Sequence, residues 1–135
     1  MIQYFTIIYF IALTSILSQE VLWPTKLGQY FSSTFGENRD SHFHMGLDVK
    51  TNGSIGMEVL AIEDGYISRM RSDYNGYGKA LYHRTISGHE VVYAHLESFT
   101  PIMEKVWRLQ QGKRRSYSVD AQFSSRDFQV KKGDL

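Results

Sequence analysis

The sequence contains no cysteine. This absence excludes disulfide bonds, thiolate nucleophiles, zinc sites built from thiolates and anchoring through a lipidated cysteine. A large excess of one charge is also absent, because 15 Lys and Arg residues are balanced by 14 Asp and Glu residues, for a formal net charge of +1. The chain as a whole therefore lacks the basic surplus that favours binding to nucleic acid or to an anionic membrane. Any metal ion must be bound by nitrogen and oxygen ligands.

The first 18 residues, MIQYFTIIYFIALTSILS, carry no charge. The apolar stretch from Phe5 to Leu17 is typical of a secretory signal peptide, although no Lys or Arg precedes it. An uncleaved membrane anchor and a buried helix are the alternatives, since a spanning helix needs about 20 apolar residues. We expect residues 1–18 to be a signal peptide or membrane anchor, residues 19–30 a linker or edge segment, and residues 31–135 one small domain.

After Trp23–Pro24 the sequence consists mostly of short β-type runs separated by glycines. The run MEVLAIEDGYISRMRS predicts two strands, Met57 to Ile62 and Tyr66 to Arg71, joined by a hairpin turn at Asp64–Gly65. The runs KALYHR and HEVVYAHL predict another pair of strands, joined through Ser87–Gly88. The sequence therefore predicts a mainly β domain with antiparallel sheets.

One helix is expected after these strands. In FTPIMEKVWRLQQGKRR, Thr100 can cap the first turn, Pro101 suits the first helical position, and apolar residues recur at helical spacing until Gly112. The helix either packs on the sheet or binds a partner, and packing is the simpler interpretation. The basic residues 113–115 are interpreted as a solvated helix end, where positive charge suits the helix dipole.

The stretch HFHMGLDVKT, residues 42–51, places His44 and Asp48 on either side of Gly46. In a straight strand the two residues would be about 13 Å apart, too far for ligands that each sit ~2 Å from one zinc ion. The flanking residues argue against a helix, so the segment must bend if the two side chains are to meet. Gly46 permits such a bend and leaves space for an ion and its water. The pattern is compatible with a zinc site and also with surface hydrogen-bonding groups.

A third polar residue of interest, His95, ends the predicted strand VVYAHL. Strand alternation places it on one face with Val91 and Tyr93. Taken alone, it is either a half-buried histidine that bonds a backbone carbonyl or a histidine that takes part in chemistry. The sequence pattern does not separate these two interpretations.

Five blocks of this sequence occur in the order found in a known family. They are SSTFGENRDSHFHMGLDVKT, GMEVLAIEDGYISRM, GYGKALYHR, HEVVYAHL and FQVKKGDL, and they run from about Phe31 to Leu135. In these blocks the chain resembles the LytM/lysostaphin-type zinc metallopeptidases, which cut peptide bonds in bacterial peptidoglycan. The resemblance implies that His44 and Asp48 are two of the three protein ligands to one zinc ion and that His95 is a catalytic histidine beside it.

The resemblance also implies a fold and a location. The fold would be a mainly antiparallel β-sheet of the barrel-sandwich hybrid type, with a narrow groove at the zinc, and Arg39 would occupy a recurrent family position. The partners would be peptidoglycan peptides, with amidase or divisome proteins as further candidates, outside the cytoplasm. Only the N-terminal segment would contact a membrane. Three tyrosines either line the groove or pack in the sheet, namely Tyr74, Tyr77 and Tyr82.

The resemblance is incomplete at the C-terminal end. The family has a His-x-His block shortly after the VKKGD turn, and its second His is the third protein ligand, whereas this sequence ends at Leu135. A catalytic zinc site ordinarily has three protein ligands and a water. His42 is too near in sequence to fold back from an extended segment, and His83 and His89 are expected to face solvent. We therefore expect a C-terminally truncated domain with a helical insertion near residues 100–112.

Three other functions are compatible with the sequence. A non-catalytic LytM-type domain would bind cell wall or activate an amidase. The runs VLAIEDGYI and VKKGDL also resemble biotinyl or lipoyl carrier domains, which need an exposed hairpin lysine, and Lys79 lies in no such motif. The third is an extracytoplasmic β domain with no catalytic role. The DNA sequence that follows the Leu135 codon would discriminate between the endopeptidase and the non-catalytic domain.

Overall fold

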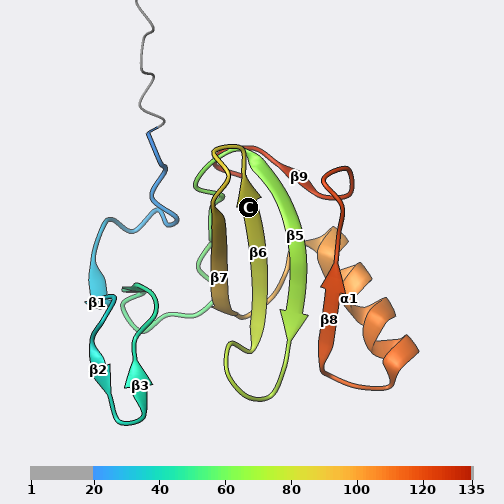
Figure 1. The fold of residues 1–135 in the computed structure, drawn as a ribbon, viewed down its shortest axis with the longest axis horizontal. Coiled ribbons are helices and arrows are strands. Elements are labelled where there is room, and N and C mark those ends of the chain that lie inside the picture. The colour runs from blue at the N-terminus through green and yellow to red at the C-terminus, as the bar shows by residue number, and fades with distance from the viewer. Residues whose placement is uncertain (1–19, 135) are drawn as a thin grey trace, which may run out of the picture.

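The structure is a computed structural model that describes residues 20–134. The signal peptide or anchor predicted for residues 1–18 lies outside this range. Figure 1 shows two parts side by side, a small lobe of four short strands and a larger sheet with one helix. Within the described range, no helix is long and apolar enough to cross a membrane. The prediction of a mainly β protein with antiparallel sheets is confirmed.

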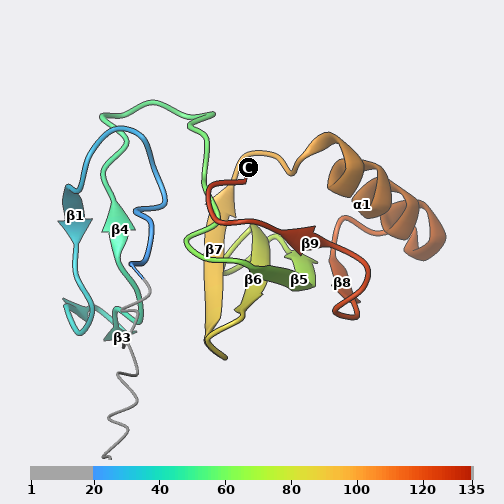
Figure 2. The same ribbon diagram turned by 90° about the horizontal axis from the view of Figure 1, so that it is seen from above.

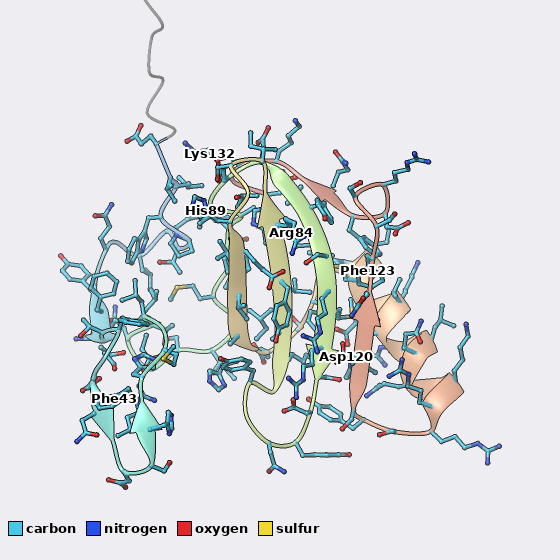
Figure 3. The ribbon with its side chains drawn as sticks, in the orientation of Figure 1. Phe43, Arg84, His89, Asp120, Phe123 and Lys132 are labelled. Carbon is cyan, nitrogen blue, oxygen red and sulfur yellow. The ribbon has the colours of Figure 1, made fainter. Side chains whose placement is uncertain are left out.

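The lobe consists of two small antiparallel ladders. Strand β1 (Phe31–Ser33) pairs with β4 (Asp48–Val49), and β2 (Asn38–Arg39) pairs with β3 (His42–Phe43). Two-stranded sheets are marginally stable by themselves in water. The lobe also leaves large apolar side chains exposed, including Phe43, which Figure 3 labels on β3. Its order therefore depends strongly on contacts between polar side chains.

The larger sheet holds five strands. Four of them have the order β7-β6-β5-β8, and β9 pairs with β5. Their bounds are Gly65–Ser72 for β5, Lys79–Thr85 for β6, Glu90–Leu96 for β7, Val119–Gln122 for β8 and Gln129–Val130 for β9. The β6–β7 hairpin is the one predicted through residues 87–88. In both Figure 1 and Figure 2, β7 is the strand of this sheet nearest to the lobe.

The strand predicted from Met57 to Ile62, and its hairpin through Asp64–Gly65, are wrong. Strand β5 already pairs with β6 on one edge and with β8 and β9 on the other. No edge of β5 is therefore open to this segment. The segment instead accepts a backbone hydrogen bond from Leu22 at 2.9 Å and donates one to the carbonyl of Asp134 at 2.8 Å. It thereby connects the two ends of the described chain.

Helix α1 (Pro101–Arg114) packs against the larger sheet, which was the simpler of the two interpretations of its sequence. It begins after Thr100 with proline at its first position, as predicted, but the Thr100 side chain makes no capping hydrogen bond, so the capping role expected for it is wrong. It does not end at Gly112 but continues to Arg114, and Arg115 takes the left-handed conformation that closes the helix, with φ of 49°. The buried side chains of the core come from both layers and are Ile67, Met70, Phe99, Met103, Trp107, Val119 and Ala121.

A polar link crosses this core and fixes the helix on the sheet. The indole N–H of Trp107 donates to Ser72 Oγ at 2.8 Å, and the Ser72 hydroxyl donates to the carbonyl of Tyr117 at 2.7 Å. The Lys79 ammonium lies 4.1 Å from the centroid of the Trp107 ring and 3.3 Å from the Glu104 carboxylate. Each of these largely buried polar groups has a partner, and these contacts offset the free-energy cost of removing the groups from water.

We predict that Trp107→Ala lowers the free energy of unfolding by about 3–5 kcal/mol, because it removes a large core side chain and leaves Ser72 without its donor. Chemical denaturation followed by circular dichroism measures this change. Leu109→Ala, on the exposed face of the same helix, is the matched control and is expected to change stability by about 0.5 kcal/mol or less. Equal losses in the two variants would contradict this description of the core.

The expectation that His83 faces solvent is wrong, because its side chain is fully buried at 0% exposure. In the β5–β6 ladder it pairs with Ile67, whose side chain belongs to the core. Its Nδ1 lies 3.4 Å from the hydroxyl of Tyr93. Burial lowers the pKa of His83, and the nearby Glu63 carboxylate opposes that shift. His89 is exposed as expected, at the same end of the molecule as Arg84 and Lys132 in Figure 3.

We predict that the stability of the fold falls as the pH is lowered below about 6.5, the ordinary pKa of an unfolded histidine. Because the pKa of His83 is lowered in the folded state, the unfolded chain binds the proton more readily, and acid favours unfolding. Denaturation curves measured between about pH 7.5 and about pH 5 test this dependence. His83→Asn is expected to flatten it, and the matched variant His89→Asn is expected to preserve it. A slope that survives in the His83 variant would contradict the assignment.

Candidate metal centre

The structure brings His44 and Asp48 together in the lobe. The chain leaves β3 after Phe43, bends at Gly46 and enters β4 at Asp48, so the segment is neither a straight strand nor a helix. His44 Nε2 and Asp48 Oδ1 lie 3.1 Å apart as a result. The bend inferred from the spacing of these residues is present. The His44 side chain is 13% exposed and that of Asp48 is 41% exposed, so the pair opens to solvent mainly on the carboxylate side.

The imidazole of His44 is held from behind by the end of β1. Its Nδ1 lies 3.0 Å from the backbone carbonyl oxygen of Thr34 and 3.0 Å from Ser33 Oγ. A carbonyl oxygen can only accept a hydrogen bond, so the proton of a neutral His44 ring belongs on Nδ1. The lone pair of Nε2 then points toward Asp48. Histidines that ligate metals are oriented in this way, with the second ring nitrogen bonded to a carbonyl or carboxylate.

The carboxylate of Asp48 is held from the other side by Arg39. The guanidinium Nη2 lies 2.5 Å from Asp48 Oδ2 and also donates to Ser33 Oγ at 3.1 Å. The Ser33 hydroxyl in turn contacts the Glu37 carboxylate. These contacts leave Asp48 Oδ1 directed at His44 while Oδ2 is engaged by the arginine. Ser33 therefore contacts both the His44 ring and the arginine that holds Asp48.

The geometry of this pair fits a shared divalent cation. Two ligand atoms bound tetrahedrally to zinc at ~2.0 Å are about 3.3 Å apart, and His44 Nε2 and Asp48 Oδ1 are separated by 3.1 Å. With the proton on Nδ1, both atoms present lone pairs to each other, which is unfavourable unless a cation or proton lies between them. Imidazole nitrogen and carboxylate oxygen are ligands that zinc accepts.

Gly46 contributes space rather than an unusual backbone angle. It is not among the glycines with positive φ, so the bend does not require glycine for its conformation. A Cβ at this position would instead lie 3.6 Å from His44 Nε2. The absent side chain leaves the space beside this nitrogen unfilled.

His95 lies on the larger sheet, and the face predicted for it is wrong. Lys79 pairs with Leu96 and Leu81 with Tyr93, so β7 has one residue more than β6 between these pairs. Regular alternation would place His95 on the same face as Tyr93. Because of this β-bulge, Leu96 lies on that face instead. His95 is exposed, with a φ of 56° that is uncommon for a residue other than glycine.

The pair in the lobe is not joined by a third metal-binding side chain in residues 20–134, where no group of three or more His, Asp or Glu side chains is placed to hold one ion. His95 instead contacts Tyr77, whose ring centroid lies 6.2 Å away in an edge-on arrangement and whose carbonyl accepts the His95 N–H at 3.0 Å. His42 is exposed and lies beside Ser41. The sheet edge that carries His95 nevertheless faces the lobe in both views of the fold (Figures 1 and 2).

The other residues considered in the sequence have structural surroundings. Tyr82 is buried below the guanidinium of Arg69, and Tyr74 stacks at a tilt on Tyr117. Lys79 is 11% exposed and engaged by Glu104, so it is not the exposed hairpin lysine of a carrier domain. Tyr77 is the one tyrosine of the three beside a candidate catalytic residue.

Sequence reasoning missed the residues that orient the pair. The roles of Ser33 and Thr34 depend on the pairing of β1 with β4, which joins segments that no local pattern relates. Arg39 had been noted without a role, and the structure places it on Asp48. The only sequence signal for these residues was their presence in the same block as the histidine and the aspartate.

Comparisons of this chain with protein-family models, with curated proteins and with solved structures found no match.

We predict that Gly46→Ala weakens zinc binding by about tenfold or more, a range typical of changes next to a metal site. The added methyl group would lie 3.6 Å from His44 Nε2, in van der Waals contact with the atom that would bind the ion, while the backbone angles of residue 46 remain allowed. Competition with a chromophoric chelator measures the affinity. Gly112→Ala is the matched control, because that glycine also lacks positive φ and a Cβ there meets nothing within 4 Å. Unchanged affinity in the Gly46 variant would place the ion elsewhere.

Proposed function

We propose that this chain contributes to a zinc-dependent endopeptidase that hydrolyses peptide bonds in bacterial peptidoglycan. The observation that carries the proposal is the approach of His44 Nε2 to Asp48 Oδ1 at 3.1 Å, with the opposite ring nitrogen held by a backbone carbonyl. The chemistry of this pair supports a metal site. The choice of reaction and substrate rests on the five blocks that resemble LytM/lysostaphin-type peptidases.

The proposed roles follow from the contacts of each side chain. His44 and Asp48 would bind the ion, and the Thr34 carbonyl and Arg39 would keep their donor atoms turned toward it. When bound, zinc polarises a substrate carbonyl and lowers the pKa of water to near ~7. The imidazole of His95 would transfer a proton during bond cleavage. Its position on the sheet edge that faces the lobe is compatible with this role.

A catalytic zinc site ordinarily uses three protein ligands. The pair in the lobe supplies two, so a third ligand would come from outside residues 20–134 in this proposal. With two protein ligands alone we expect weak binding. The proposal also places the protein outside the cytoplasm, where peptidoglycan is found, as the apolar segment over residues 1–18 suggests.

Zinc binding tests the metal part of the proposal. We predict that the purified chain binds one zinc ion per molecule and that His44→Ala and Asp48→Asn each weaken binding at least about tenfold. His95→Ala is expected to retain the ion. His42→Ala and His89→Ala are matched controls, since both are exposed histidines outside the pair. Binding that persists in both pair variants, or that needs His42, would contradict the assignment of the ligands.

A hydrolysis assay tests the catalytic part of the proposal. It uses the complete gene product, with any residues encoded after Leu135. We expect the protein to release new amino groups from purified peptidoglycan. A chelator is expected to stop this release, and added zinc is expected to restore it. His95→Ala is expected to keep zinc and lose the release. Zinc-loaded protein that binds peptidoglycan without releasing amino groups would contradict the endopeptidase and support the non-catalytic domain. Release that continues in excess chelator would contradict the role of the metal.

A further inference from the structure

Helix α1 carries a second surface feature that the proposed function does not use. Positions 102, 105, 109 and 113 follow one another at spacings of three or four residues, so they lie on one face of the helix. They are Ile102, Lys105, Leu109 and Lys113, and we call them the outer stripe. All four are exposed, whereas Met103 and Trp107 of the same helix are buried. The outer stripe therefore faces away from the core.

The outer stripe alternates apolar and basic side chains. Ile102 is 64% exposed and Leu109 is 65% exposed, and the two lie seven residues apart on one helix face. A helix that only shields a core would carry polar residues at these positions. Basic side chains beside apolar ones are typical of helices that lie in the interface of a membrane, where the apolar residues insert and the basic residues meet lipid headgroups.

The charge around the outer stripe is strongly one-sided although the whole chain is nearly neutral. Residues 105–115 contain five Lys and Arg residues and no Asp or Glu. Two carboxylates near this segment are engaged: Glu104 contacts Lys79 and also Arg108 of the same helix at 3.6 Å, and Asp120 contacts Arg69. Beside the stripe, a shallow hollow of about 470 Å³ is lined by Arg108, Gln111, Gly112, Arg115, Ser116 and Tyr117. Two arginines, Arg108 and Arg115, are therefore among the residues that border this shallow hollow.

The position of α1 in the fold is compatible with such contact. In Figures 1 and 2 the helix lies at the end of the molecule opposite the lobe that holds His44 and Asp48. A protein bound to a surface through α1 would keep the lobe directed away from that surface. The two regions can therefore be engaged at the same time.

We propose that the outer stripe of α1 docks the protein on an anionic lipid bilayer. Lys105 and Lys113 of the stripe, together with the exposed Arg108 beside it, provide the attraction to acidic headgroups. Ile102 and Leu109 enter the boundary between headgroups and acyl chains. The exposed apolar pair favours a bilayer over a soluble polyanion, because a polyanion is bound by charge alone and gains nothing from aliphatic side chains. This inference does not depend on the metal site.

Vesicle sedimentation of the full chain tests the proposal, with vesicles of equal parts phosphatidylglycerol and phosphatidylcholine compared with pure phosphatidylcholine. The neutral vesicles report binding through any other part of the chain. We expect tighter binding to the anionic vesicles at ~0.1 M salt, and loss of the difference at ~1 M salt, where the Debye length falls to about 3 Å. The triple variant Lys105→Gln/Arg108→Gln/Lys113→Gln is expected to weaken anionic binding about a hundredfold.

A second set of variants isolates the apolar part. Ile102→Ser/Leu109→Ser is expected to weaken binding to anionic vesicles at least about tenfold. Ile86→Ser is the matched control, because Ile86 is equally exposed at 64% but lies at the β6–β7 turn. The charge control is Lys26→Gln/Arg126→Gln/Lys132→Gln, which removes three exposed basic residues elsewhere. Circular dichroism verifies that each variant is folded.

Two results would overturn the proposal. One is a basic triple variant that binds anionic vesicles as tightly as the unaltered chain or as tightly as its charge control. The other is binding that depends on charge but not on Ile102 and Leu109, together with equal binding to soluble heparin, which would identify the surface as a polyanion site.

Discussion

The candidate site depends on the hydrogen bond between His44 Nδ1 and the backbone carbonyl of Thr34. This bond assigns the ring proton, and it thereby determines which nitrogen of His44 is free to bind a ligand. The bend at Gly46 then brings that nitrogen to Asp48 Oδ1, and Arg39 holds the carboxylate from the opposite side. If the single proton of a neutral ring were on Nε2 instead, the 3.1 Å approach would be an ordinary histidine–aspartate hydrogen bond.

The two parts of the molecule are stabilised in different ways. The larger sheet and α1 enclose an apolar core, and the link from Trp107 to Ser72 fixes their relative position. The lobe has short ladders and many exposed apolar side chains, so polar contacts such as that of Ser33 with His44 contribute more of its order. A cation bound by residues of the lobe would therefore also stabilise the fold of the lobe, because binding to the folded state favours that state.

The features that the sequence predicted correctly are those encoded over short distances. The β6–β7 hairpin and the start of α1 after Thr100 each follow from a local pattern of residues. The errors arose where distant segments decide the outcome. The segment Met57–Ile62 is not a strand because both edges of β5 are occupied by strands far along the chain. A bulge, which alternation cannot reveal, moved His95 to another face.

Nitrogen-15 NMR of the histidine rings reports which nitrogen of His44 carries the proton and which one binds an added ion. We expect that neutral His44 carries its proton on Nδ1, and that added zinc shifts the Nε2 resonance of His44 while its Nδ1 stays protonated. The exposed rings of His42 and His89 serve as internal references in the same spectrum. A His44 ring that is protonated on Nε2 when neutral, or that does not respond to zinc, would contradict the account.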